Sequence, residues 1–148
     1  MKIGEKFLLW TGLASVVYLF WPSQKSVAFG GLNKSCPLPT QDSQLNSKNR
    51  QNAKDNFVYG PLKENPVSFW NRIARKWKVS VSKAQSRRCG NCVAFDISPG
   101  MKKCMDTTSN EVGYCWMHKF KCSAARTCAT WAQNGPIRTD EESSKWQK

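Results

Sequence analysis

The longest apolar stretch in the chain lies near its start, from Phe7 to Trp21. These fifteen residues (FLLWTGLASVVYLFW) carry no charge. As a helix they extend about 22 Å, which is short of the roughly 30 Å hydrocarbon core of a bilayer. The stretch fits a signal peptide with a small-x-small cleavage site at 26–28, a short membrane anchor, or an apolar helix buried in an assembly. We expect residues 1–28 to form an apolar helix, anchor or leader, and we expect it to stay on the mature chain.

The next segment has almost no apolar periodicity. Residues 30–57 contain Gly-Gly, two prolines and many Asn, Gln, Ser and Lys residues. Such a composition is typical of a linker, so we expect a flexible basic arm over residues 29–58. Cys36 stands alone in this arm, and no partner for it is evident in the sequence.

An apolar pattern with helical spacing begins after Asn65-Pro66, a pair that is typical of a helix start. It predicts one amphipathic helix with an apolar stripe made by Phe69, Trp70, Ile73, Ala74 and Trp77. A second short helix, capped by Ser80 or Ser82, is expected to run through Ala84 to Arg87.

We expect this stripe to pack into the core of the neighbouring module. The alternative is that this helix binds a partner, a nucleic acid or a membrane surface. The residues expected to form that binding face are Trp70, Arg72, Arg75, Lys76 and Trp77.

The net charge of +13 is concentrated in the middle of the chain, since residues 32–88 hold twelve Lys and Arg against three Asp and Glu. A basic segment favours phosphate backbones, anionic lipids or acidic proteins. The sequence therefore suggests polyanion contact, with DNA or anionic lipid, through residues 32–88. A solvated basic linker explains the charge equally well.

Six of the seven cysteines fall in the last 60 residues of the chain, at positions 89, 92, 104, 115, 122 and 128. The first two form a Cys-x-x-Cys pair, which places two thiolates on one tight turn and suits a metal or an iron–sulfur cluster. A segment of about 40 residues builds little apolar core, so the sulfurs are expected to stabilise it.

The motifs Cys89-Gly-Asn-Cys92-Val-Ala-Phe95, Gly113-Tyr-Cys115 and Cys128-Ala-Thr-Trp131 resemble those of the high-potential iron–sulfur proteins, which are small loop-rich folds with one 4Fe–4S cluster. The resemblance implies Cys89, Cys92, Cys115 and Cys128 as cluster ligands. The aromatic shell that it implies comprises Phe95, Tyr114, Trp116 and Trp131. Cys104 and Cys122 have no counterpart in that family, and they are left as a disulfide or, with His118, as alternate ligands. A zinc site, three disulfides, or buried thiols without a metal are the alternatives.

A wider set of motifs runs from Tyr59 to Ile137 and includes CGNC, GYCW and TCATW. This pattern is similar to small cysteine-rich proteins of tailed, mainly marine bacteriophages, and that resemblance implies a virion-associated role. The chain contains no phosphate-binding glycine loop and no Ser/His/Asp set, so we expect no enzyme and no small-molecule substrate. The tail from 138 to 148, with its acidic cluster, is expected to be solvated.

The predicted fold is a small, irregular, loop-rich module over residues 59–137, stabilised by cysteines or a metal and led by short α-helices. We expect a non-enzymatic virion structural protein that docks to neighbouring subunits. The alternative is a membrane-anchored one-electron carrier.

Overall fold

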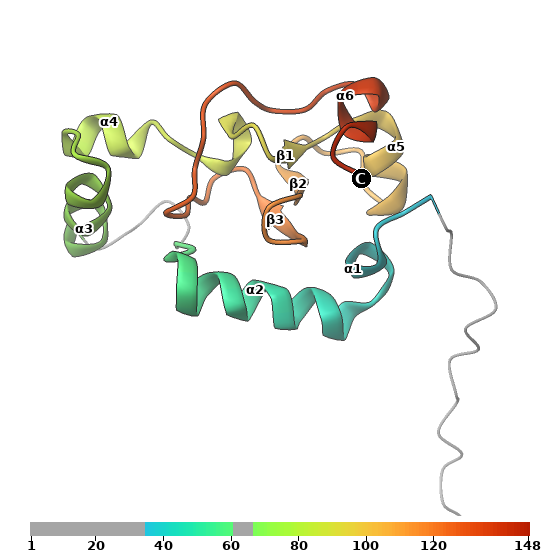
Figure 1. Ribbon diagram of the computed structural model, residues 1–148, viewed down its shortest axis with the longest axis horizontal. Coiled ribbons are helices and arrows are strands. Elements are labelled where there is room, and N and C mark those ends of the chain that lie inside the picture. The colour runs from blue at the N-terminus through green and yellow to red at the C-terminus, as the bar shows by residue number, and fades with distance from the viewer. Residues whose placement is uncertain (1–34, 61–66) are drawn as a thin grey trace, which may run out of the picture.

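A three-stranded antiparallel sheet lies at the centre of the chain in the computed structural model, which describes residues 35–60 and 67–148 (Figure 1). Its strands are β1 (Phe95–Asp96), β2 (Val112–Cys115) and β3 (Phe120–Ser123), in the order β1-β2-β3. The strands are only two to four residues long, so the sheet alone buries little surface.

The two faces of the sheet hold different side chains, because successive residues of a strand point to opposite sides. Phe95 pairs with Cys115, which pairs with Phe120, so these three side chains share one face. Tyr114 points to the other face, where it packs with Met101 and Met105 beside α5 (Pro99–Cys104). The cysteine face is therefore separate from the methionine face.

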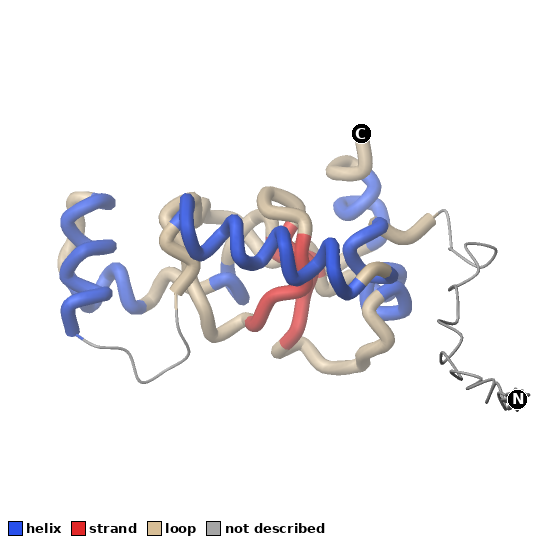
Figure 2. The backbone as a smooth tube through the Cα atoms, turned by 90° about the horizontal axis from the view of Figure 1, so that it is seen from below, coloured by secondary structure: helices blue, strands red, loops and turns tan. Residues whose placement is uncertain are grey.

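The segment expected to be a flexible arm forms two helices, α1 (Leu38–Gln41) and α2 (Ser43–Phe57), so that prediction was wrong for these residues. The Asp42 side chain caps α2 by accepting from the backbone N–H groups of Gln44 and Leu45. Figure 2 shows α2 lying across the strands.

Polar contacts, with little apolar burial, attach α2 to the sheet. Asn46 Oδ1 accepts a 2.7 Å hydrogen bond from the backbone N–H of Lys121, and Asn49 Nδ2 donates one of 2.7 Å to the carbonyl of Lys119. Only Ala53 on this helix is fully buried and apolar. A helix held by asparagines has no apolar stripe, which is why its sequence resembles a linker.

Cys36 is disulfide-bonded to Cys104, 68 positions away, with a Cα–Cα distance of 5.4 Å. The expectation that Cys36 has no partner was therefore wrong, and so was the suggested disulfide between Cys104 and Cys122. The bond joins the start of α1 to the end of α5, two elements whose proximity only the fold creates.

We predict that replacing both Cys36 and Cys104 by Ser lowers the free energy of unfolding by about 3 kcal/mol, since the bond closes a long loop in the unfolded chain. Urea unfolding measures the change. The control is Cys36→Ser alone, which should lose nearly the same amount because either substitution breaks the bond. Equal stability of the double variant and the native chain would contradict the disulfide.

The amphipathic helix predicted after Asn65-Pro66 is confirmed as α3 (Val67–Trp77), and the second helix as α4 (Val81–Gln85). Ser80 caps α4 by accepting from the backbone N–H of Lys83. The stripe residues Phe69, Trp70, Ile73 and Ala74 are buried, as predicted, but in a cluster with Ala84 of α4 that is separate from the cluster around the cysteines. Asn65 and Pro66 themselves lie outside the described residues.

The C-terminal tail is attached to the module by a short helix, while its acidic residues Asp140, Glu141 and Glu142 are exposed, as expected. It forms α6 (Asp140–Ser144), where Thr139 and Glu142 make a reciprocal capping box. The Asp140 carboxylate accepts from the backbone N–H of Gly100 on α5, and buried Ser143 donates to Asp96 of β1. Glu142 thus caps the start of α6, and Asp140 attaches this start to α5.

The apolar segment predicted over 1–28 lies outside the described residues. Among the helices of the described ranges, none is both long and apolar enough to cross a bilayer.

Candidate metal centre

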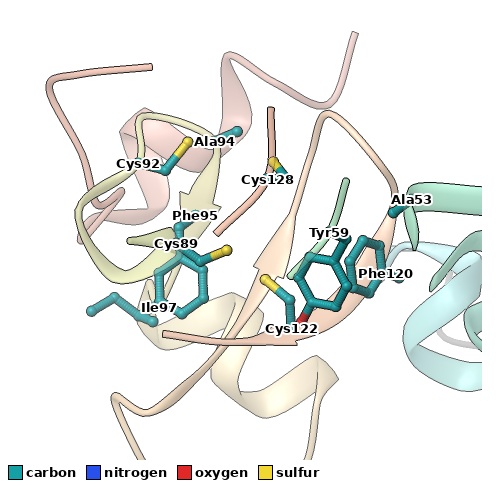
Figure 3. Packing of buried hydrophobic residues seen from close by; sticks show 10 residues of the cluster. All are labelled: Ala53, Tyr59, Cys89, Cys92, Ala94, Phe95, Ile97, Phe120, Cys122 and Cys128. Carbon is teal, nitrogen blue, oxygen red and sulfur yellow. The ribbon is translucent and has the colours of Figure 1, made fainter. Parts of the chain in front are cut away.

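Five free thiols line one small cavity beside the sheet, and they come from four parts of the chain. Cys89 begins the 3-10 helix η2 (Cys89–Asn91) and Cys92 follows it directly. Cys115 ends β2, Cys122 lies in β3, and Cys128 lies in the loop beyond. Figure 3 shows the sulfurs of Cys89, Cys92, Cys122 and Cys128 around one region between the η2 turn and the hairpin. The structure therefore brings together all four cysteines of the predicted ligand set, and Cys122 with them.

Backbone hydrogen bonds fix the η2 turn against the loop after β3. The N–H of Cys89 donates to the carbonyl of Arg126, at 2.6 Å, and the N–H of Gly90 donates to the carbonyl of Ala124. On the other side, a Cβ at Gly135 would overlap the carbonyl of Cys92, so only glycine allows this approach. The Cys-x-x-Cys turn is thus held from both sides before any ligand binds.

The thiols are close to one another. All five line a cavity with a volume of only about 10 Å³, room for about one water. Across residues 35–60 and 67–148, no three His, Cys, Asp or Glu side chains stand in an arrangement that would hold a metal ion as they are. The five cysteine sulfurs lie around one cavity, and their side chains would have to move for a metal to bind between them.

Backbone N–H groups point at three of the sulfurs. Cys92 accepts from Ala94 and Ala132, and Cys128 accepts from Thr130. Cys115 accepts from Met117 and His118. Such backbone donors stabilise negative charge on sulfur, which is the charge of a bound thiolate.

Burial sets the protonation of the free thiols. It raises the pKa of Cys92, and it raises the pKa of Cys128 to about 12. The interaction between the thiols of Cys115 and Cys122 raises the pKa of Cys122 and lowers the pKa of Cys115. Metal binding at such a site releases protons.

His118 lies at the edge of the thiol cluster. Its Nε2 is 2.7 Å from Thr130 Oγ1 and 3.7 Å from Cys128 Sγ, and its ring stacks at 4.5 Å on Phe57. Burial lowers the pKa of His118, which keeps the ring neutral. The ring is placed to support Cys128, and it does not line the cavity.

The cavity wall contains two of the four predicted shell residues, Phe95 and Trp131. Tyr114 and Trp116 do not line it, although Trp116 packs against the buried cluster that contains the cysteines. Tyr114 faces the methionine side of the sheet, and Trp116 donates its indole N–H to Asp96 at 2.8 Å. Sequence reasoning missed Met117 and Thr130, which do line the cavity. They stand two residues after Cys115 and Cys128, where the chain turns back over each sulfur.

The five proposed partner-binding residues divide into two groups. Trp70 is 3% exposed, and the indole N–H of Trp77 donates to the carbonyl of Ala129, so both tryptophans stabilise the fold. Arg72, Arg75 and Lys76 are exposed on the opposite face of α3.

Comparison of the chain with protein-family models, with curated proteins and with solved structures finds no match. The site is therefore interpreted from its own geometry.

Proposed function

We propose that the thiol cavity holds a 4Fe–4S cluster, with Cys89, Cys92, Cys115 and Cys128 as its ligands. One observation carries this proposal: five of the seven cysteines are free of disulfides and face one cavity, while the other two form a disulfide elsewhere. Neighbouring thiols that face one another oxidise to disulfides by thiol–disulfide exchange. Coordination to a metal explains how they persist in a chain that also carries a disulfide.

The donor set suits an iron–sulfur cluster. The wall contributed by Phe95, Met117 and Trp131 is apolar, and N–H groups are directed at the sulfurs of Cys92, Cys115 and Cys128. Both features tune and stabilise thiolate-bound clusters. When bound, the cluster would supply a redox-active group and would crosslink four parts of the chain.

Zinc is the second candidate because the thiol cavity is small. In a tetrahedral site with Zn–S bonds of about 2.3 Å, pairs of sulfurs lie only roughly 3.8 Å apart. A single ion thus needs less movement of the cavity wall than a cubane needs.

We propose a non-enzymatic structural role, in a phage virion, in which the module docks to neighbouring subunits. The burial of Cys89, Cys92, Cys122 and Cys128 supports this, since a centre bound to buried sulfurs stabilises the fold around it. The short strands support it as well, because a bound metal would supply folding free energy that so small a sheet lacks. The phage assignment rests on the resemblance of the CGNC, GYCW and TCATW motifs alone.

A one-electron carrier is the competing function, and one observation favours it. Met117 lines the cavity and is 38% exposed, so a single side chain separates the centre from solvent on that side. Electron transfer needs such a short path, whereas a purely structural centre does not.

Anaerobic purification of the full chain, followed by metal and sulfide analysis, tests the proposal. We expect about four iron and four sulfide per chain, and a brown protein absorbing near about 400 nm. A colourless protein with one zinc would replace the cluster by a zinc site. A protein without metal whose five thiols have become disulfides would contradict both.

Two further measurements separate the functions. A reversible one-electron couple in voltammetry supports the carrier. Peptides of this chain in purified virions support the structural role, and their absence from particles that are otherwise complete would contradict it.

A further inference from the structure

The strongest charge asymmetry in the described residues lies in the basic hairpin, which we define as residues 67–88 and which comprises α3, α4 and the chain up to η2. It contains no Asp or Glu, and its seven cations are Arg72, Arg75, Lys76, Lys78, Lys83, Arg87 and Arg88. The first five are exposed. Within residues 35–60 and 67–148, no carboxylate pairs with any of the seven. The hairpin therefore presents uncompensated positive charge.

Three of these cations form a stripe along α3. Arg72, Arg75 and Lys76 are spaced at i, i+3 and i+4, so they share the face opposite the buried stripe of Phe69, Trp70 and Ile73. The helix is about 16 Å long, and DNA phosphates recur about every 3.4 Å along a strand. A rigid helix of this length extends past several consecutive phosphates.

Arg87 provides an independent indication of an anionic ligand. Its guanidinium lies 5.2 Å from the Trp77 ring centroid and 4.9 Å from that of Trp131, so both indoles hold it in place. Its side chain makes no hydrogen bond to any described residue, and its Nε is buried without a partner. A positioned guanidinium with unused donors matches a phosphate oxygen.

The neighbouring Arg88 shows the contrast. Its Nε donates to the carbonyl of Gln85 and its terminal nitrogen to the carbonyl of Ala125, each at 2.8 Å, and its guanidinium covers Trp70. The fold uses the donors of Arg88 and leaves those of Arg87 free.

The apolar face of α3 decides between nucleic acid and lipid. A helix that lies in a membrane surface inserts its apolar face between lipids. Here that face is already buried, with Phe69 at 7%, Trp70 at 3% and Ile73 at 1% exposed. The exposed face of α3 carries the cations Arg72, Arg75 and Lys76. Such a face suits contact with the phosphates of a nucleic-acid backbone, without contacts to the bases.

We propose that the basic hairpin binds the phosphate backbone of nucleic acid, with Arg72, Arg75 and Lys76 along one strand and Arg87 on a phosphate held beside Trp77 and Trp131. The binding is independent of sequence. It does not depend on the metal proposed above, because none of the four cations, Arg72, Arg75, Lys76 and Arg87, lines the thiol cavity.

The test is fluorescence anisotropy of the full chain with a labelled 20-base-pair DNA duplex across a salt series. We expect micromolar or weaker binding, with a slope of log affinity against log salt of about −4, since each phosphate contact contributes about −0.9. The double variant Arg75→Ala, Lys76→Ala should weaken binding at least about tenfold at low salt and reduce the slope by about two. Alanine is a good helix former, so this variant keeps α3.

The matched control is Arg138→Ala with Lys145→Ala, which removes the same two charges from exposed positions at either end of α6. It should bind the duplex within about twofold of the native chain, since electrostatic contact is local on the scale of the Debye length. Equal weakening by the two double variants would show an effect of net charge only and would overturn the proposal.

Arg87→Gln and Arg87→Lys test the contact between Arg87 and a phosphate. The Arg87→Gln variant should bind the duplex more weakly than the native chain. The Arg87→Lys variant should recover only part of the affinity, because an ammonium lacks the planar donors of a guanidinium. Undiminished binding by Arg87→Gln would overturn the role of Arg87.

A second experiment measures binding of the full chain to vesicles with 30% anionic lipid. The choice of nucleic acid would be overturned if the chain binds the vesicles but not the duplex, and if the Arg75→Ala, Lys76→Ala variant loses the binding to vesicles.

Discussion

Replacing Cys92, Cys115 or Cys128 by Ser is expected to abolish stoichiometric metal binding and to destabilise the module. Each of these sulfurs faces the cavity and accepts backbone N–H hydrogen bonds that favour a thiolate. Because a structural metal contributes on the order of 10 kcal/mol to folding, we expect a loss of more than about 4 kcal/mol in the free energy of unfolding. Metal analysis and chemical unfolding of anaerobically purified variants measure both effects.

Cys122→Ser is the matched control, since Cys122 lines the same cavity and is 4% exposed. The thiols of Cys115 and Cys89 raise its pKa, so it is the least suited of the group to bind as a thiolate. We expect this variant to retain the metal and to lose about 1 kcal/mol. If Cys122→Ser loses the metal while Cys128→Ser retains it, the ligand assignment is wrong and Cys122 takes the place of Cys128.

The second large effect is expected at Asp96, a carboxylate with no exposed surface. It accepts hydrogen bonds from the backbone N–H of Ser98, the indole of Trp116 and the hydroxyl of Ser143. Asp96→Ala leaves these three donors without an acceptor in a buried place. We expect a loss of about 3–5 kcal/mol in the free energy of unfolding, measured by urea titration.

Two milder variants show whether the stability depends on the hydrogen bonds to Asp96 or on the volume of its side chain. Asp96→Asn keeps the shape and one acceptor oxygen, and it should lose less than the alanine variant. Ser143→Ala removes one donor only and should cost about 1 kcal/mol. An Asp96→Ala variant as stable as Ser143→Ala would show that Asp96 does not organise this junction between β1, Trp116 and α6.

Local signals were sufficient for α3 and α4. The apolar spacing from Phe69 to Trp77 and the cap at Ser80 are properties of neighbouring residues, and they predicted both helices and the buried face. The Cys-x-x-Cys pair likewise predicted a tight turn, because local geometry is enough to bring two cysteines three positions apart to the same side.

Longer-range relations were invisible in the pattern. The α2 helix is held by side-chain amides that bond to the backbone near residue 120, and nothing in its own composition indicates that partner. Cys36 pairs across 68 positions with Cys104, and this requires α1 and α5 to lie together. The side of the sheet that Tyr114 faces follows from strand register, which placed it away from the sulfurs.

The sequence by itself determined the cysteine-rich module, its helical lead-in and the basic charge of the middle segment, since composition and short spacing encode these directly. Only the tertiary structure decided which sulfurs meet. It placed Cys122 inside the cavity, removed Cys104 from it, and left Arg87 without a partner between two tryptophans. The physical reason is that a pairing between distant residues depends on how the elements pack, and no local propensity carries that information.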